Sequence, residues 1–515
     1  MHEMRSIRVI ARLDVKGSNV VKGVQFEALR VIGKPGEVAE MYYKQGADEL
    51  VYIDIVASLY RRENLLHIVK EASKSIFIPF TVGGGVRSLE DIHDLLQAGA
   101  EKVAINTAAT KRPELLKEAA ERFGAQCVVL SIEAKRTGNG WQAFTDNGRE
   151  PTGLDVIEWA KRGQELGAGE ILLTSVDREG TQKGLEKELI QAVSSAVSIP
   201  VIAAGGASSP ENIADVMAAS DADAVAVGSL LHYGKTTISE IKDAVFAKKV
   251  SVRRATEAER AFKHAPAKEV DVTDYNKFTL KQFEQNGNVS ESADDLQTRA
   301  ASEADVTVID YGINNVRSVV KAIQSFGTSV AIAKTVEEMR GSRRLLLPGV
   351  GAFPDGIAAL KERGFIEPVR EAIRNNIPFL GICLGLQLLF SESEEFGAHE
   401  GLDSIKGKVV SFPDPKTANI PGYKLPHIAW TSIREPIHGR WKDSIFASTE
   451  PQEKVYFVHS FYPVPEDPKD ILAIATYGGV DFCAAIQRGS VTATQFHLEK
   501  SGAAGLGMLR AFCET

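Results

Sequence analysis

The feature that most constrains the fold of this chain is an internal repeat in its first half. Glu49 and Glu170 lie 121 residues apart in matching strand-like runs, and Gly84 and Gly205 lie 121 residues apart in matching glycine turns. A four-strand unit that occurs twice closes naturally into an eight-stranded barrel with approximate twofold symmetry. The repeat therefore predicts a barrel over roughly the first 250 residues.

Eight short runs rich in β-branched residues support this prediction, and helical patterns such as Pro113–Phe123 and Gly153–Leu166 separate them. The runs are Val9–Leu13, Leu50–Ile55, Phe77–Val82, Val103–Asn106, Cys127–Ile132, Glu170–Val176, Val201–Ala204 and Ala224–Gly228. Eight strand–helix units in about 250 residues are typical of a (β/α)8 barrel. A doubly wound sheet would give the same local patterns, so it is the repeat that favours the barrel.

The glycine turns of the repeat predict two anion-binding cups. The active face of such a barrel lies at the carboxyl ends of its strands, where glycine turns offer backbone N–H groups to phosphate. One predicted cup comprises Gly84, Gly85, Asn106 and Thr107, and its repeat mate comprises Gly205, Gly206, Gly228 and Ser229, helped by Gly180 and Thr181. Two opposite cups suit an elongated ligand with a phosphate at each end, although each glycine pair alone is also typical of a plain turn.

Two carboxylates occupy matching positions in the repeat. Asp14 ends the first predicted strand, and Glu133 ends the fifth. They would face each other across the middle of an elongated ligand, as a pair suited to general acid–base catalysis. Each could instead be a solvated strand end, but their agreement with the repeat favours catalysis.

The second half of the chain contains a candidate nucleophile, Cys383, in the sequence Gly381-Ile-Cys-Leu-Gly385. An apolar run before it predicts a strand, and apolar residues at helical spacing after it, up to Phe390, predict a helix. A sharp strand-to-helix turn would expose the cysteine at a helix N-terminus, where a thiolate is stabilised. A buried, inert cysteine in a glycine-flanked strand is the competing interpretation.

A base for this nucleophile is found far downstream. His497 and Glu499 are two residues apart, so on an extended segment they would share a face and the carboxylate could orient the imidazole. A cysteine with a base, and a group that orients the base, is the arrangement for thiol-dependent acyl transfer. The three residues together favour a catalytic triad.

Composition narrows the class of protein. The 515 residues carry 60 basic and 68 acidic side chains, without a basic run that would indicate nucleic acid or a membrane surface. No apolar stretch reaches transmembrane length, and the N-terminus lacks the apolar core of a signal peptide. Four cysteines in so long a chain do not form a disulfide scaffold. We expect a cytoplasmic enzyme without a metal or other cofactor.

The chain is too long for one ordinary core, and a polar tract divides it. Residues 253–304 are charge-dense and poor in aliphatic side chains, which predicts a flexible, solvated linker. The predicted domains are therefore 1–252 and 305–515. Within the linker, the apolar group of Tyr275, Phe278, Leu280 and Phe283 is a candidate for a short docked piece.

At these motifs the chain resembles a known family. Residues 5–250 resemble the cyclase subunit of imidazole glycerol phosphate synthase, and residues 305–515 resemble its glutaminase subunit, a class I glutamine amidotransferase. The cyclase motifs are Leu13-Asp-Val-Lys16, Val21-Val-Lys-Gly, Phe80-Thr-Val-Gly-Gly-Gly85, Val103-Ala-Ile-Asn-Thr107 and Asp177-Arg-Glu-Gly-Thr181. The glutaminase motifs are Asp310-Tyr-Gly312, Leu347-Pro-Gly-Val-Gly-Ala-Phe353, Gly381-Ile-Cys-Leu-Gly385, Lys424-Leu-Pro-His427, Tyr456-Phe-Val-His-Ser460 and Phe496-His-Leu-Glu499.

The resemblance implies a function for each half. Cys383 would attack glutamine, His497 would move protons and Glu499 would orient it, while backbone N–H groups of Gly349, Gly351 and Leu384 would hold the oxyanion. Ammonia would pass from the docked glutaminase through the barrel, and Lys22 would help bind a bisphosphorylated ribulosyl aminoimidazole carboxamide. The products would be imidazole glycerol phosphate and aminoimidazole carboxamide ribonucleotide. The ammonia gate would comprise Arg8, Glu49, Lys102 and Glu170, which the residues alone would predict to be rim salt bridges.

Departures from the family pattern leave the ammonia acceptor open. Arg12 stands where the family has cysteine, and Glu133 stands where it has aspartate. The glutaminase half has Asn314, Ala429-Trp430-Thr431 and Leu498 where glycine, Gly-Trp-Asn and proline are usual. The barrel changes resemble a paralogous group that supplies ammonia to a partner sugar amidotransferase for amidination of surface polysaccharide. A non-enzymatic scaffold is the third hypothesis, disfavoured because the triad residues and both cups are present.

Overall fold

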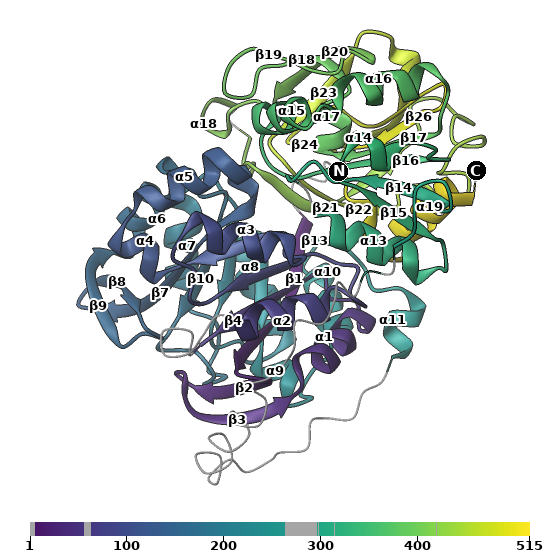
Figure 1. The fold of residues 1–515 in the computed structure, drawn as a ribbon. Helices are drawn as coiled ribbons and strands as arrows, with labels where there is room; N and C mark the ends of the chain where they lie inside the picture. Colours follow the sequence, from purple (N-terminus) through teal and green to yellow (C-terminus); the bar gives the residue numbers. More distant parts are fainter. Residues whose placement is uncertain are drawn as a thin grey trace.

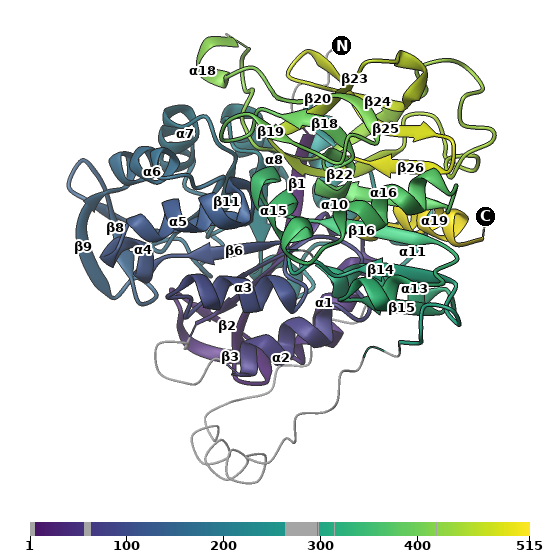
Figure 2. The same ribbon diagram turned by 45° about the horizontal axis from the view of Figure 1, so that its top comes forward.

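The computed structural model describes residues 6–55, 63–262, 296, 298–313, 315–418 and 420–514. Figures 1 and 2 show two bodies packed against each other, one coloured purple to teal and the other green to yellow. Asn314 and the group Tyr275, Phe278, Leu280 and Phe283 lie outside the described residues. Among the helices of the described part, none is long and apolar enough to cross a membrane.

The first body is a closed parallel barrel, as the repeat predicts. Its strands, in order around the barrel, are β1 (Ser6–Lys16), β4 (Glu49–Asp54), β5 (Phe80–Gly83), β6 (Lys102–Ile105), β7 (Val128–Thr137), β10 (Glu170–Ser175), β11 (Val201–Ala204) and β12 (Ala224–Val227). β12 pairs back with β1, with Arg8 opposite Ala224, which closes the barrel. All eight predicted strands are present, although β5 begins three residues later than expected.

Helices surround the barrel because each buries one apolar face against it. The longer ones are α1 (Pro35–Lys44), α2 (Glu63–Ala72), α3 (Leu89–Gln97), α5 (Glu114–Phe123), α6 (Val156–Glu165), α7 (Lys187–Ala196), α8 (Pro210–Ala219) and α10 (Ile238–Ala247). The short helices α4 (Thr107–Lys111) and α9 (Ser229–His232) follow β6 and β12. Helix α6 begins after the predicted Gly153 because Asp155 caps it, accepting hydrogen bonds from the N–H groups of Ile157 and Glu158.

Two hairpins that the sequence did not predict rise from the barrel. β1 continues into β2 (Asn19–Val24) and β3 (Glu27–Gly33), and β7 continues into β8 (Gly140–Thr145) and β9 (Glu150–Asp155), all antiparallel. They occupy matching places in the repeat. Because β1 and β7 extend to pair with these hairpins, Asp14 and Glu133 lie within strands, which corrects the prediction that they end them.

The second body contains a nine-stranded mixed sheet and a smaller four-stranded one. The large sheet has the order β15 (Val330–Ala333), β14 (Val306–Ile309), β16 (Leu345–Gly349), β17 (Phe379–Cys383), β26 (Val491–Thr494), β25 (Val480–Arg488), β24 (Ile471–Tyr477), β21 (His427–Arg434) and β22 (Lys454–His459). The small sheet comprises β19 (His399–Glu400), β18 (Phe390–Ser393), β20 (Ile405–Ser411) and β23 (Phe461–Pro465). Helices α13 (Val316–Ser325), α15 (Phe353–Glu362), α16 (Ile366–Arg374) and α19 (Gly502–Glu514) pack on them.

The helix predicted after Cys383 is a single turn, α17 (Leu384–Gln387). The prediction of a longer helix was wrong because Phe390 begins β18, which pairs with β20. Apolar spacing alone cannot separate a helix from a buried turn followed by a strand.

The second body covers the end of the barrel where its strands begin. Trp430 Nε1 donates to the backbone oxygen of Asp48 at 3.0 Å, immediately before β4. Lys500 pairs with Glu101, before β6, at 2.8 Å, and Lys424 pairs with Asp223, before β12, at 3.1 Å. Three separate strand starts therefore contact the C-terminal domain.

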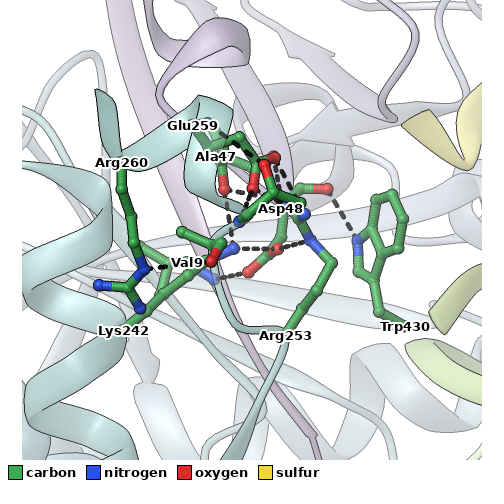
Figure 3. Close-up of polar contacts among 11 residues, drawn as sticks. Val9, Ala47, Asp48, Lys242, Arg253, Glu259, Arg260 and Trp430 are labelled. Atoms are coloured by element: carbon green, nitrogen blue, oxygen red, sulfur yellow. Dashed lines mark hydrogen bonds and ion pairs between the residues drawn. The ribbon is translucent and has the colours of Figure 1, made fainter. Parts of the chain in front are cut away.

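The first residues of the predicted linker belong to this junction. The buried carboxylate of Asp48 accepts from Val9 N at 2.8 Å, Lys242 Nζ at 2.5 Å and Arg253 Nε at 2.7 Å (Figure 3). The Arg253 guanidinium also lies 4.8 Å from the centre of the Trp430 ring. The expectation of a solvated tract is therefore wrong for Arg253, because a buried carboxylate needs cationic partners.

Candidate active site

Cys383 occupies a strained, nearly buried turn between β17 and α17. Its φ is +54°, a left-handed conformation that is unfavourable for a residue with a side chain. A Cβ at Gly385 would lie 1.9 Å from the Leu347 carbonyl oxygen, and one at Gly381 would lie 2.9 Å from the Gly385 oxygen. The two flanking glycines are therefore required by close backbone packing, and they hold the cysteine at the tip of the turn.

His497 and Glu499 form the expected pair, with His497 Nδ1 and Glu499 Oε1 2.7 Å apart. They meet across the 3-10 turn η3 (Leu498–Lys500), not along an extended strand as predicted. Burial would lower the pKa of His497, but Glu499 and then Cys383 outweigh it and raise that pKa well above its usual value. His497 Nε2 is buried and has no nitrogen or oxygen partner among the described residues, which suits proton exchange with Cys383.

The predicted oxyanion residues lie around the same turn. Gly349 is directly opposite Cys383 in the pairing of β16 with β17, and Leu384 is the first residue of α17. A Cβ at Gly349 would lie 2.5 Å from the buried hydroxyl of Tyr311. Gly351 has φ +109°, and a Cβ there would lie 3.7 Å from the Phe123 carbonyl oxygen of the barrel. The loop from Gly349 to Gly351 thus connects the turn that holds Cys383 to the barrel surface.

Two glutamines beside Cys383 were missed in the sequence. Gln495 Nε2 lies 3.7 Å from the Cys383 sulfur, within the range for a hydrogen bond to sulfur. Gln387 Nε2 donates to Gln495 Oε1 at 3.1 Å. Their positions in the sequence could have indicated this contact. Gln387 is four residues after Cys383, and Gln495 is two residues before His497.

The four predicted gate residues form a closed ring of alternating charges inside the barrel. Arg8 pairs with Glu49 at 2.6 Å and with Glu170, and Lys102 pairs with Glu49 at 2.6 Å and with Glu170 at 2.5 Å. All four side chains are fully buried. Burial opposes the charge of Arg8, but Glu170 and Glu49 raise its pKa above the usual value. The residues are thus a complete buried ring, not rim salt bridges.

The ring lies between the Cys383 site and an apolar barrel interior. Tyr456 of the C-terminal domain is fully buried, and burial and then Glu49 raise its pKa. On the other side, small and branched side chains fill the interior: Ile10, Val51, Ala104, Val129, Leu172, Ile202, Ala204, Ala224 and Ala226. A charged constriction followed by an apolar segment would pass neutral ammonia more readily than ammonium.

At the far end of the interior, Asp14 is held by two cations. It accepts from Arg12 Nε at 2.9 Å and from Lys22 Nζ at 2.7 Å, and Lys22 also pairs with Glu179. Burial would raise the pKa of Asp14, but Arg12 and Lys22 lower it well below its usual value. Arg12 further donates to Thr174 at 2.9 Å, so its guanidinium spans from β1 to β10.

Glu133 has a different environment from Asp14. It accepts from the Gly148 N–H at 2.8 Å, and burial raises its pKa to about 7 despite that bond and the nearby Arg12. One carboxyl is therefore kept ionised while the other is able to exchange a proton near neutral pH. This separation is the usual mark of an acid–base pair.

Replacing Glu133 by glutamine should change stability in a pH-dependent way. Because the folded-state pKa is raised, the native state favours the protonated form, and this contribution is lost as the pH rises through about 7. The free energy of unfolding of the wild type should therefore fall between pH 5 and pH 8.5, whereas Glu133→Gln lacks this loss. For a half-buried side chain, we expect the difference in free energy of unfolding, variant minus wild type, to be about 1–2 kcal/mol larger at pH 8.5 than at pH 5. Thermal unfolding at both pH values measures this; an equal difference at the two would contradict it.

The predicted cup in the second half of the repeat lines a cavity. Gly180, Gly205, Gly206, Gly228 and Ser229 line one cavity together with Arg12. A Cβ at Gly228 would lie 3.3 Å from Lys22 Nζ, so the cup carries an ammonium group. Thr181 does not line this cavity and donates to the Arg178 carbonyl oxygen at 2.7 Å.

The first predicted cup has the same close backbone packing as the second. A Cβ at Gly84 would lie 2.3 Å from the Asp54 oxygen, as one at Gly205 would lie 2.5 Å from the Ser175 oxygen. Gly85 has a positive φ, Asn106 donates to the Phe144 oxygen at 3.3 Å and Thr107 begins α4.

Among the described residues, no group of three or more His, Cys, Asp or Glu side chains is placed to hold a metal.

Comparison with protein families assigns both halves of the chain. The family of histidine biosynthesis proteins matches residues 8–237, and that of class-I glutamine amidotransferases matches residues 307–514. These matches define the class: the protein is an enzyme in which a glutaminase domain of the amidotransferase type is joined to a barrel.

Two relatives narrow the class. The imidazole glycerol phosphate synthase subunit HisF of Legionella pneumophila is 64% identical over 204 residues, which cover 39% of this chain and 96% of that protein. The subunit of the same name from Dehalococcoides mccartyi is 49% identical over 250 residues, which cover 48% of this chain and 99% of that protein. The chain belongs to the imidazole glycerol phosphate synthase subunit HisF family through its barrel, as the resemblance predicted.

Proposed function

We propose that this protein is a glutamine-dependent, ammonia-channelling imidazole glycerol phosphate synthase. Its units would be the barrel 1–252, the connection 253–304 and the glutaminase domain 305–515. Ammonia from glutamine would react in the barrel with a bisphosphorylated ribulosyl aminoimidazole carboxamide, giving imidazole glycerol phosphate and aminoimidazole carboxamide ribonucleotide. The observation that carries the proposal is the buried ring of Arg8, Glu49, Lys102 and Glu170 between the two candidate sites.

The chemistry at Cys383 follows from its neighbours. The thiolate attacks the amide carbon of glutamine, and the backbone N–H groups of Gly349, Gly351 and Leu384 donate hydrogen bonds to the oxygen on which negative charge develops. His497 gives a proton to the leaving nitrogen, so ammonia departs and a thioester remains. Water, deprotonated by His497, then releases glutamate and restores the thiol. Glu499 holds the imidazole in position throughout.

Ammonia must then reach the barrel site without meeting water, because ammonium has no free electron pair and does not react as a nucleophile. The ring would admit it to the apolar interior, and that interior leads to Asp14 and Glu133. Asp14 and Glu133 would serve ring closure and release of the carboxamide product as acid and base. The two cups, with Lys22, would hold the terminal phosphates.

A nitrogen-competition experiment tests this proposal. The enzyme is given the ribulosyl substrate, glutamine labelled with 15N in its amide, and an excess of unlabelled ammonium. We expect imidazole glycerol phosphate to form and to retain most of the label, because channelled ammonia does not mix with the solution. Loss of the label with product still formed would contradict channelling, and absence of the product would contradict the assigned acceptor.

A second candidate function rests on Arg12. Its guanidinium crosses the interior beside Asp14, where the family has the small cysteine side chain, and Glu133 is one methylene longer than the family's aspartate. Such a barrel would keep the glutaminase and the route for ammonia but supply a partner sugar amidotransferase for polysaccharide amidination. Glutamine hydrolysis that requires another protein, without imidazole glycerol phosphate, would support this candidate.

A further inference from the structure

A chain of hydrogen bonds runs from the C-terminal domain's buried histidines to the Cys383 sulfur. Thr431 Oγ1 and His427 Nε2 are 2.7 Å apart, His427 Nδ1 and His459 Nε2 are 3.1 Å apart, and His459 Nδ1 lies 2.8 Å from the Phe461 carbonyl oxygen. Gln387 Nε2 donates to that same oxygen at 3.0 Å and to Gln495 Oε1 at 3.1 Å. All of these side chains are buried.

The Phe461 carbonyl sets the direction of every bond in the chain, because it can only accept. His459 must therefore carry its proton on Nδ1, which leaves Nε2 as an acceptor for His427 Nδ1–H. His427 Nε2 is then an acceptor for the Thr431 hydroxyl. Burial lowers the pKa of His427 well below its usual value and that of His459 to about 3, which agrees with two neutral rings.

The same carbonyl also orients the two glutamines. Gln387 must turn its amide nitrogen, not its oxygen, toward Phe461, and this nitrogen also reaches Gln495 Oε1. Gln495 is thereby left with its amide nitrogen toward Cys383, 3.7 Å from the sulfur. An N–H group aimed at sulfur stabilises the thiolate more than the thiol, because a hydrogen bond to a charged acceptor is the stronger one.

We propose that Gln495 is a catalytic residue that stabilises the reactive thiolate of Cys383, and that Gln387, His459 and His427 are positioning residues that fix its amide orientation through the Phe461 carbonyl. This inference rests on the proposed thiol chemistry at Cys383 and deepens it.

The His459 ring can be altered with a matched pair of variants. Asparagine places an amide N–H near the position of Nδ1 and keeps a donor for the Phe461 oxygen, whereas leucine keeps the apolar bulk and removes the donor. The ring also packs within 5.5 Å, centre to centre, of Phe412, Phe457 and Phe482, so both variants disturb the packing. A structural role alone would therefore affect the two variants alike.

The test measures alkylation of Cys383 by iodoacetamide between pH 5.5 and 9, with the modified peptide quantified by mass spectrometry, and the kcat and KM of glutamine hydrolysis. We expect Gln495→Met to slow alkylation at pH 7 and to lower kcat by about 10-fold or more, as for loss of a hydrogen bond to a charged group. His459→Leu should lower the alkylation rate at pH 7 and kcat by about 3-fold each. The rise of its alkylation rate with pH should be moved to higher pH. His459→Asn should stay near the wild type, and KM should change little in all three.

Wild-type rates for Gln495→Met, or equal losses for His459→Asn and His459→Leu, would overturn the inference. If His459→Leu does not fold, Gln495→Met decides alone. A different result would contradict the proposed thiol chemistry itself. That result is alkylation of Cys383 in the wild-type protein no faster at pH 7 than alkylation of the buried Cys483.

Discussion

Cys383→Ala is expected to abolish glutamine-dependent turnover while sparing turnover with added ammonium. Removing the nucleophile of a triad enzyme lowers kcat by at least about 10⁴-fold, because the remaining groups cannot form the covalent intermediate. The barrel site lies beyond the buried ring and the apolar interior, so its residues are untouched by this change. Glutamate formation and product formation, measured with glutamine and then with ammonium at raised pH, provide the readout.

Cys127 offers a matched control for this prediction. It is a buried thiol at the end of the barrel where the strands begin. Burial, and then the charge of the nearby Cys383, raise its pKa to about 12. Such a thiol is not ionised near neutral pH, so Cys127→Ala should keep glutamine-dependent turnover within about 2-fold. Loss of ammonium-dependent turnover in Cys383→Ala would instead show that the two sites are not separable.

The barrel could be predicted from the sequence because its strands are buried on both faces and the repeat shows them twice. The hairpins β2–β3 and β8–β9 could not, because they are short and partly exposed and lack a strong alternating pattern. Missing them also hid one of the two cationic partners of Asp14. Lys22 reaches that carboxylate only because β2 folds back on β1.

The candidate active site divides in the same way. Cys383, His497 and Glu499 were predictable because each lies in a short local motif with a known chemical purpose. The contact of Gln495 with the sulfur depends on β17 and β26 lying side by side, with Ile382 opposite Thr494, and no local pattern reports that pairing. The four residues of the buried ring show the same limit. Arg8, Glu49, Lys102 and Glu170 come from four strand starts, and only closure of the barrel brings their charges into one ring.

Junction residues show a third kind of limit. Arg253 belongs to a charge-dense tract that composition alone predicts to be solvated, but it is drawn in by the buried carboxylate of Asp48. The cause lies 205 residues earlier in the chain. Composition describes what a segment can do by itself, whereas a buried charge elsewhere determines what it does in the fold.

Asp14→Asn is expected to stop the barrel reaction while leaving glutamine hydrolysis in place. The change keeps the shape of the side chain but removes the charge between Arg12 and Lys22 and the ability to exchange a proton. Loss of general acid–base catalysis lowers the rate by about 10²–10⁴-fold. We therefore expect imidazole glycerol phosphate formation to fall by that factor, with glutamate release at the opposite end of the barrel within about 2-fold of the wild type.

Glu179→Gln is the control that separates charge balance from catalysis. Glu179 is the other carboxylate paired with Lys22, and it is buried like Asp14. If Asp14 only compensates the two cations, both variants should reduce product formation and thermal stability to a similar extent. If Asp14 exchanges a proton with the substrate, Asp14→Asn must lose far more product formation than Glu179→Gln at equal stability, and equal losses would remove Asp14 from the acid–base pair.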